Sequence, residues 1–206
     1  MDSFDISIYL GEAATQCQFA LAAARHFNNA LNKTLNKPRD NSSDATTQGW
    51  DWHREVFVAI HSLLTHASNV SKIFWPAGDG RDEATRKRLE RAKELRAYIG
   101  LPDDNHFLKD RKLRNHLEHF DERLDQWRET RQHRHYVQDI IAPKGAIAGI
   151  EEKYFFRWYD QNTRRFIFRG EPFDIQALVT AIGQLLPLAV EGSDRATREM
   201  SKTNRQ

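Results

Sequence analysis

The sequence predicts a mainly α protein, a bundle of about five helices with a β-hairpin inserted before the last helix. Two observations carry this prediction. Apolar residues recur at three- and four-residue steps over long stretches, and one short region instead alternates aromatic and polar residues. The first spacing places side chains on one face of a helix, and alternation places them on one face of a strand. We expect a single domain over residues 1–206, because this length can bury a proper core.

The composition excludes several classes of protein. The 31 Lys and Arg residues exceed the 29 Asp and Glu residues by only two, so the chain lacks the basic field of a dedicated duplex-DNA binder. Cys17 is the single cysteine, and its place on an alanine-rich stripe predicts a core residue rather than a nucleophile. The acidic start lacks the basic region of a signal peptide, and no apolar run approaches the roughly 18 residues of a membrane span. These features predict a cytoplasmic protein with no membrane partner.

Two long amphipathic helices are predicted first, over residues 6–35 and 51–75, and Pro76 ends the second. The residues between them, 36–49, contain nothing apolar enough to anchor them and predict a flexible loop. Beside the apolar stripe of the second helix runs a polar column that consists of Ser62, His66 and Asn69. This column is either a partly wet helix edge or a set of accessory residues that line a cleft.

A third helix is predicted from Asp82 or Glu83 to about Gly100. It is rich in basic residues, which are Arg86, Lys87, Arg88, Arg91, Lys93 and Arg96. Such a run is usually a solvated face with ion pairs between successive turns, and the alternative is contact with a phosphate backbone.

A fourth helix is predicted over about 106–131, and it carries an unusual collection of polar side chains between Lys112 and Asp121. Leu113, Leu117, Phe120, Leu124 and Trp127 would form its buried stripe. On an ideal straight helix that turns about 100° per residue, Arg114 points about 140° away from His119. One such helix therefore cannot easily aim both side chains at one phosphate, but two copies across a two-fold axis can.

The chain changes character after Tyr136. Residues 136–141 favour a strand, and two aromatic runs around residues 160–163 predict a β-hairpin with one buried face that carries Phe156, Trp158, Phe166 and Phe168. We assign residues 136–170 to this insert. A C-terminal helix over 171–192 would be capped by Asp174, kinked at Pro187 and ended by Gly192, with a frayed polar tail over 193–206.

The segment Arg114-Asn115-His116-Leu117-Glu118-His119 resembles the motif of the HEPN (higher eukaryotes and prokaryotes nucleotide-binding) superfamily. That motif is an Arg, then a polar Asn, Asp or His, then a His after four to six intervening residues in all. Three other arginines, Arg54, Arg111 and Arg128, are followed by a His at this spacing, but Asn115 makes the pair that starts at Arg114 the one match with the polar residue. The resemblance extends over residues 5–135 in the expected arrangement of helices, and over about ten residues in the motif itself.

This resemblance implies a metal-independent endoribonuclease that needs no cofactor, acts on RNA as a homodimer with its active site at the dimer interface, and serves as a toxin with an antitoxin protein or as an antiphage-defence effector. His119 would take the proton of a ribose 2′-OH, Arg114 would neutralise charge on the phosphate, and Asn115 would position it. His116 is either the general acid or a residue that fills space. Glu118 is an accessory candidate that would hold Arg114.

Three alternatives belong to other classes. A zinc site would use His116, His119, His133 and His135, but the chain has no second cysteine and no His-Glu-x-x-His order, so no metal is expected. The motif is otherwise only a polar helix face rich in His. The serious alternative is a non-catalytic, dimeric HEPN-like module that binds nucleotide, RNA or a partner protein.

Overall fold

The computed structural model describes residues 1–36, 51–102, 106–110, 112, 119–130, 137–151 and 154–203. The chain divides into two compact units. Unit 1 comprises residues 1–22, 63–111 and 178–206, and unit 2 comprises residues 23–62 and 112–177. Neither unit is continuous in sequence, because the three longest helices each contribute to both.

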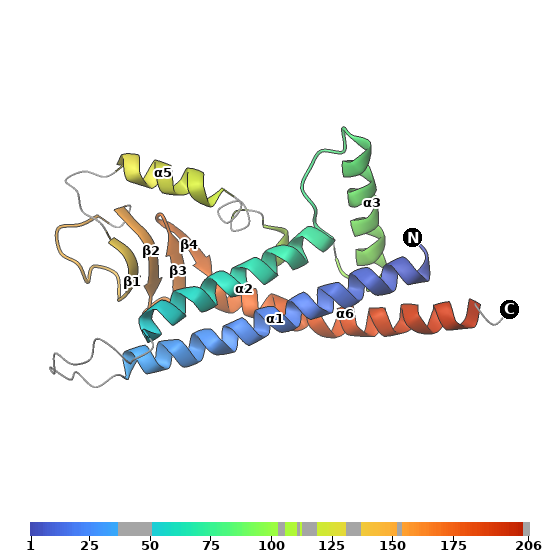
Figure 1. The fold of residues 1–206 in the computed structure, drawn as a ribbon, viewed down its shortest axis with the longest axis horizontal. Coiled ribbons are helices and arrows are strands. Elements are labelled where there is room, and N and C mark those ends of the chain that lie inside the picture. The colour runs from blue at the N-terminus through green and yellow to red at the C-terminus, as the bar shows by residue number, and fades with distance from the viewer. Residues whose placement is uncertain are drawn as a thin grey trace. The chain divides into compact units, whose positions relative to one another are not determined.

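The first three predicted helices are present as α1 (Ser3–Leu35), α2 (Trp52–Phe74) and α3 (Glu83–Tyr98) (Figure 1). Cys17 is fully buried on α1, and this burial raises the pKa of its thiol to about 12. The prediction that it is a core residue is thus confirmed. The predicted loop over 36–49 lies outside the described residues, apart from Asn36.

Asp82 caps α3, as predicted. Its Oδ1 accepts a hydrogen bond from the Thr85 backbone N–H at 2.8 Å, and its Oδ2 accepts one from the Thr85 hydroxyl at 2.6 Å. Three of the basic side chains on α3 make contacts with other residues of unit 1. Arg88 donates to the Thr85 hydroxyl, and Arg91 lies over the Tyr9 ring. Arg96 donates to the Phe74 carbonyl. Part of this basic run therefore has a structural role.

The last helix, α6, spans Ile175–Thr203, with Pro187 inside it. Asp174 caps it as predicted, since its Oδ1 accepts from the Ala177 N–H at 2.8 Å. The prediction that Gly192 ends the helix and that a frayed tail follows is wrong. Gly192 is buried against Leu10 and Ile99, where a Cβ atom would come within 2.7 Å of both side chains. A glycine here allows close packing inside the helix rather than a stop.

The tail of α6 is held by contacts within unit 1. Ala196 is fully buried, and the Ser193 hydroxyl donates to the Ser7 carbonyl at 3.1 Å. The Tyr98 hydroxyl donates to Glu199 at 2.9 Å, and the Arg195 guanidinium stacks on the Tyr98 ring. These contacts stabilise a helical tail whose own sequence is polar.

Among the described residues, α6 is long and apolar enough to cross a bilayer by length and composition alone. This differs from the expectation that no segment qualifies. The helix also carries a buried apolar stripe, in which Ile182, Leu185 and Ala189 are inaccessible to solvent. A core helix of a soluble protein has the same property, so the chain is compatible with a soluble protein.

The continuous helix predicted over 106–131 is not formed. Phe107–Lys109 is a single 3₁₀ turn, η1, and Asp110 after it has extended backbone angles. The Leu108 carbonyl accepts a hydrogen bond from the Ser71 hydroxyl at 2.7 Å, which ties the turn to α2 within unit 1. Farther along the described residues, α5 spans Phe120–Thr130. Its acidic first turn, with Asp121 and Glu122, suits a helix N-terminus.

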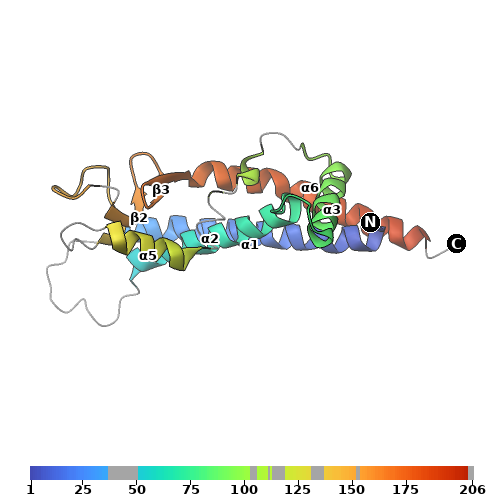
Figure 2. The same ribbon diagram turned by 90° about the horizontal axis from the view of Figure 1, so that it is seen from above.

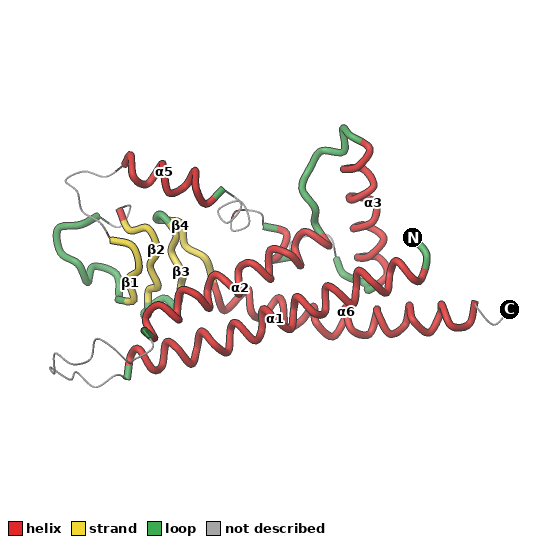
Figure 3. Tube along the Cα trace, viewed as in Figure 1, coloured by secondary structure: helices red, strands yellow, loops and turns green. Residues whose placement is uncertain are grey.

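The predicted hairpin is present as part of a larger sheet. The four strands are β1 (Val137–Ile141), β2 (Phe155–Asp160), β3 (Arg165–Phe168) and β4 (Glu171–Asp174), in the order β1-β2-β3-β4 (Figure 3). The hairpin is the antiparallel pair β2–β3, and β4 adds a further antiparallel strand. The strand predicted over 136–141 pairs with β2 in parallel.

The strand β2 is buried on both faces, so the prediction of one buried face is wrong. Phe156 contacts Trp127 of α5 at 5.0 Å between ring centroids, and both Figures 1 and 2 show α5 beside this strand. Tyr159, which should point to the other face by alternation, contacts Phe27 of α1 at 5.1 Å. β2 therefore packs against α5 on one face and α1 on the other, within unit 2.

Candidate functional site

His119 stands at the start of α5 in unit 2. Its carbonyl accepts the first helical hydrogen bond, from the Arg123 N–H at 3.0 Å, while His119 itself lies in a turn. Its side chain is 50% exposed, and Nδ1 lies 3.1 Å from a carboxylate oxygen of Glu122. A carboxylate only accepts hydrogen bonds, so Nδ1 carries the proton. In the neutral ring, Nε2 then holds the lone pair and can accept a proton.

The other motif residues, Arg114, Asn115, His116 and Glu118, lie outside the described residues. The angular argument from the sequence assumes one straight helix from Arg114 to His119. Of these residues the structure describes His119 alone, as a turn residue that precedes α5. The angle between the two side chains, and with it the homodimer, stays a prediction.

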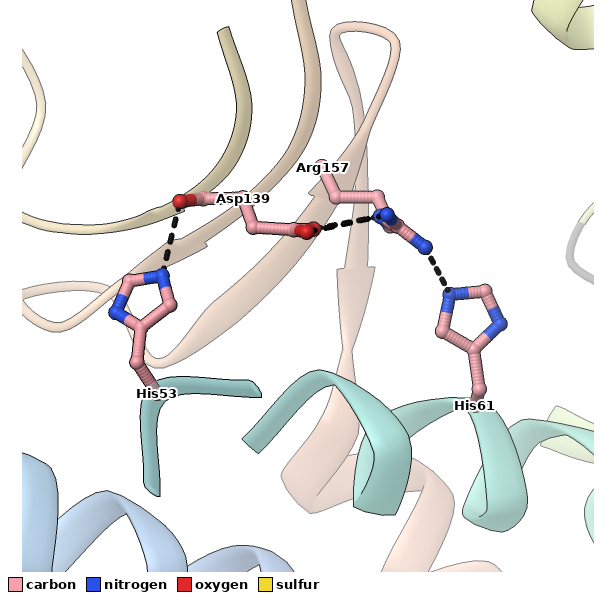
Figure 4. Close-up of polar contacts among 4 residues, drawn as sticks. All are labelled: His53, His61, Asp139 and Arg157. Carbon is pink, nitrogen blue, oxygen red and sulfur yellow. Dashed lines mark hydrogen bonds and ion pairs between the residues drawn. The ribbon is translucent and has the colours of Figure 1, made fainter. Parts of the chain in front are cut away.

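A second polar cluster in unit 2 joins α2 to the sheet (Figure 4). Arg157 of β2 and Asp139 of β1 are partners in the parallel ladder. Their side chains form a two-point ion pair, with Nε–Oδ1 at 2.6 Å and Nη2–Oδ2 at 3.1 Å. Nη1 of Arg157 lies 3.2 Å from Nε2 of His61, and Nε2 of His53 donates to the Asp139 carbonyl at 3.0 Å. The cluster thus anchors two successive regions of α2.

The contact with Arg157 determines the protonation state of His61. A guanidinium has no acceptor, so Arg157 donates and Nε2 of His61 accepts. The ring is therefore neutral, with its proton on Nδ1. Burial and the neighbouring Arg157 charge lower the pKa of His61, and the Asp139 carboxylate opposes them. His61 has its lone pair engaged and is unsuited to act as a general base.

Phe120 connects this cluster to the region of His119. Its ring contacts the edge of the His61 ring with centroids 6.5 Å apart, and it contacts Phe156 at 5.7 Å. Phe120 is the residue directly after His119. The Asp139–Arg157–His61 chain therefore helps to position the start of α5, and with it His119.

The predicted accessory residues of α2 are divided between the units. His66 and Asn69 belong to unit 1, where Nδ1 of His66 and Nδ2 of Asn69 both approach Oε1 of Gln16, at 2.8 and 3.1 Å. The amide oxygen accepts from both side chains, so these two residues join α2 to α1. Ser62 is half-buried in unit 2.

The sequence interpretation missed His53, His61, Asp139 and Arg157. A signal was present, because Arg157 stands in the middle of an aromatic run and Asp139 stands inside an apolar strand. A charge in such a place needs a partner of opposite sign. Pairing the two would have predicted that these strands are neighbours.

Among the described residues, no three His, Cys, Asp or Glu side chains are close enough together to hold a metal ion. Of the histidines considered for zinc, His119 lies within the described residues, and His116, His133 and His135 lie outside them.

Comparisons with known proteins add nothing to this description: no protein-family model matches the chain, and no curated protein or solved structure gives a significant match. The resemblance to the HEPN superfamily therefore depends on the residues of the motif.

Proposed function

We propose that this protein is a metal-independent endoribonuclease of the HEPN type, with His119 as its general base. The observation that carries the proposal is the state of His119. It is half-exposed, and its Nδ1 lies 3.1 Å from a carboxylate oxygen of Glu122, so that Nε2 is the nitrogen left for proton transfer. Such an imidazole can take a proton from a hydroxyl group near neutral pH.

The proposed reaction is the attack of a ribose 2′-oxygen on the adjacent phosphorus. Nε2 of His119 takes the 2′-hydroxyl proton as the new O–P bond forms. The bond from phosphorus to the 5′-oxygen breaks, and that oxygen is protonated by a general acid, for which His116 is the candidate. The products are a 2′,3′-cyclic phosphate and a 5′-hydroxyl end. DNA has no 2′-hydroxyl, so the mechanism is restricted to RNA.

The motif residues Arg114 and Asn115 complete the proposed site. Arg114 would stabilise the negative charge that develops on the phosphoryl oxygens, and Asn115 would position the phosphate. As the HEPN resemblance implies, we include a homodimer whose partner subunits share the active site. We also include a biological role as a toxin, controlled by an antitoxin protein, or as an antiphage-defence effector.

The deciding experiment incubates the purified protein with labelled single-stranded RNA in the presence of EDTA. We expect cleavage to 2′,3′-cyclic phosphate ends, and we expect the same oligonucleotide with 2′-deoxy residues to stay intact. His119→Ala and Arg114→Ala should each lower the rate about 100-fold or more, as the loss of a general base or a charged donor does.

A matched control variant is available in the same unit. Nε2 of His26 lies 2.7 Å from a Glu55 oxygen, and its side chain is 47% exposed, so it forms a second accessible His–Glu pair. His26→Ala should keep full activity. Circular dichroism and urea unfolding should show that all three variants are folded.

The same assay separates the alternative function. If wild type binds RNA or a nucleotide but leaves a range of RNAs intact, and His119→Ala behaves identically, the protein is a non-catalytic HEPN-like binding module. Expression in a bacterial host tests the biological role, because a toxin should arrest growth whereas its His119→Ala variant should not.

A further inference from the structure

A third cluster in unit 2 brings two arginines onto one neutral oxygen. Nη1 of Arg123 donates to Oε1 of Gln126 at 3.0 Å, and Nη1 of Arg169 donates to the same oxygen at 2.7 Å. Arg123 and Gln126 lie one turn apart on α5, and Arg169 follows β3. Two positive groups thus converge on the partial negative charge of one amide oxygen.

The cluster has donors left over and a constrained backbone. Nε of Arg123 is shielded from solvent and has no hydrogen-bond partner among the described residues. Arg169 and Gly170, with φ of 50° and 82°, form the two-residue turn that joins β3 to β4, and this turn fixes the backbone of Arg169. Burial and the nearby Arg123 charge lower the pKa of Arg169, while Glu171 acts in the opposite direction. The unpartnered Nε of Arg123 and the lowered pKa of Arg169 both fit two neighbouring cations that Glu171 offsets only in part.

The cluster lies one helical turn from His119. The Arg123 backbone N–H donates to the His119 carbonyl at 3.0 Å, so the two residues lie four positions apart at the start of α5. A phosphate bound by Arg123 would therefore be close to the proposed general base. Gln126 lies on the next turn and belongs to the same side of α5 as Arg123.

We propose that Arg123 and Arg169 form a binding site for a phosphate of the RNA backbone, in which a phosphate oxygen replaces Oε1 of Gln126 as the shared acceptor. This inference rests on the proposed function, since it names RNA as the ligand. Guanidinium groups present several N–H donors in a planar fork that matches phosphate oxygens, and a charged acceptor gives stronger hydrogen bonds than an amide. The site positions the strand and reads no base.

The binding test uses protein that cannot cleave. In a His119→Ala background, fluorescence anisotropy with a labelled single-stranded RNA measures affinity for Arg123→Gln and Arg169→Gln variants. We expect each to weaken binding about tenfold, the effect of losing a charge-assisted hydrogen bond. Losing one phosphate contact should also reduce the slope of log K against log salt by about 0.7.

The matched control is Arg128→Gln. Arg128 lies on the same helix, is exposed, and is paired loosely with Asp125 at 4.0 Å. Its loss removes the same charge from α5, so a change in RNA affinity as large as that of Arg123→Gln would assign the effect to overall charge and overturn the proposed site.

Gln126→Glu gives a second and sharper test. The new carboxylate would occupy the position between the two arginines and neutralise them. We expect this variant to raise the thermal midpoint of the protein and to weaken RNA binding at least as much as Arg123→Gln. If it raises stability and leaves RNA affinity unchanged, the cluster is structural and the proposal is wrong. This test does not depend on whether an arginine variant folds.

The outcomes for binding and cleavage can be distinguished. If the arginine variants bind RNA more weakly but the wild-type protein cleaves no RNA, the phosphate site is supported and the nuclease is contradicted. Cleavage that depends on His119 but is unaffected by Arg123→Gln, Arg169→Gln and Gln126→Glu supports the nuclease and contradicts the phosphate site. A third measurement uses inorganic phosphate and follows the thermal midpoint of the protein. If phosphate raises the midpoint of the wild type but not of these variants, and the variants keep their RNA affinity, the site binds free phosphate and its assignment to RNA is wrong.

Discussion

Arg157 donates a hydrogen bond to Nε2 of His61 across 3.2 Å, while its other nitrogens hold the carboxylate of Asp139. This relationship makes His61 neutral and joins α2 to the sheet within unit 2. The Arg157 and Asp139 side chains are 19% and 28% exposed, so the pair is mostly shielded from water. Its contribution to stability lies in avoiding an unpaired charge, because removing one partner leaves the other without compensation.

Loss of Asp139 should therefore destabilise the protein. We expect Asp139→Ala to lower the free energy of unfolding by about 2 kcal/mol, below the range for a fully buried pair because both side chains retain some exposure. Urea unfolding measures this change. Asp125→Ala removes a carboxylate from an exposed pair with Arg128 and should change stability by less than about 0.5 kcal/mol. Equal effects in the two variants would contradict the structural role of the Asp139 pair.

The neutral state of His61 predicts how stability depends on pH. The pKa of His61 in the folded protein is below the 6.5 of an unfolded chain. The unfolded state therefore binds more protons as the pH falls through this value, so the contribution of His61 is present above pH 6.5 and is lost below it.

His61→Gln keeps an acceptor for Arg157 and removes the titration. Urea unfolding between pH 8 and pH 5 should show a smaller loss of stability on acidification than wild type. His106, whose pKa is also lowered by burial, is present in both proteins and cancels in the comparison. Parallel pH profiles for the two proteins would show that His61 does not titrate differently on folding.

Local sequence signals predicted part of this fold. Apolar periodicity predicted α1 and α2, helix start and stop signals predicted α3, and side-chain oxygens predicted the caps at Asp82 and Asp174. The long helix predicted over 106–131 was wrong at its start, where a 3₁₀ turn is held by a residue distant in sequence: the Ser71 hydroxyl donates to the carbonyl of Leu108. The extension of α6 was missed for a related reason, since Gly192 has a packing role that only its neighbours reveal.

The candidate sites show the same limit. His119 and Glu122, whose side chains are hydrogen-bonded, are three residues apart in the sequence, so sequence reasoning could have predicted their contact. The pairs Arg157–His61 and Arg169–Gln126 are separated by 96 and 43 residues, and no periodicity relates their members. The parallel pairing of β1 with β2 is likewise set by tertiary contacts, because each strand has a similar propensity for either direction.

Glu122 should tune the proposed base rather than replace it. Its carboxylate holds Nδ1–H of His119 and keeps the lone pair on Nε2. We expect Glu122→Ala to lower the rate of RNA cleavage about tenfold, less than the loss for His119→Ala. Stability should change little, since the two side chains are 50% and 62% exposed. A loss as large as that of His119→Ala would indicate that Glu122 takes part directly in the chemistry.

Two glycines of α6 should respond to alanine in opposite directions. At Gly192 an added Cβ would lie 2.6 Å from Ile99 Cγ2 and 2.7 Å from Leu10 Cδ1, and Leu10 is fully buried. We expect Gly192→Ala to cost about 1–2 kcal/mol, because overpacking outweighs the helix propensity of alanine. Gly183 is exposed in the same helix, with nothing within 4 Å of such a Cβ, so Gly183→Ala should stabilise the protein by about 0.5–1 kcal/mol. Chemical unfolding of both variants measures the difference, and stabilisation by Gly192→Ala would contradict the packing of the α6 tail on α1 and on Ile99.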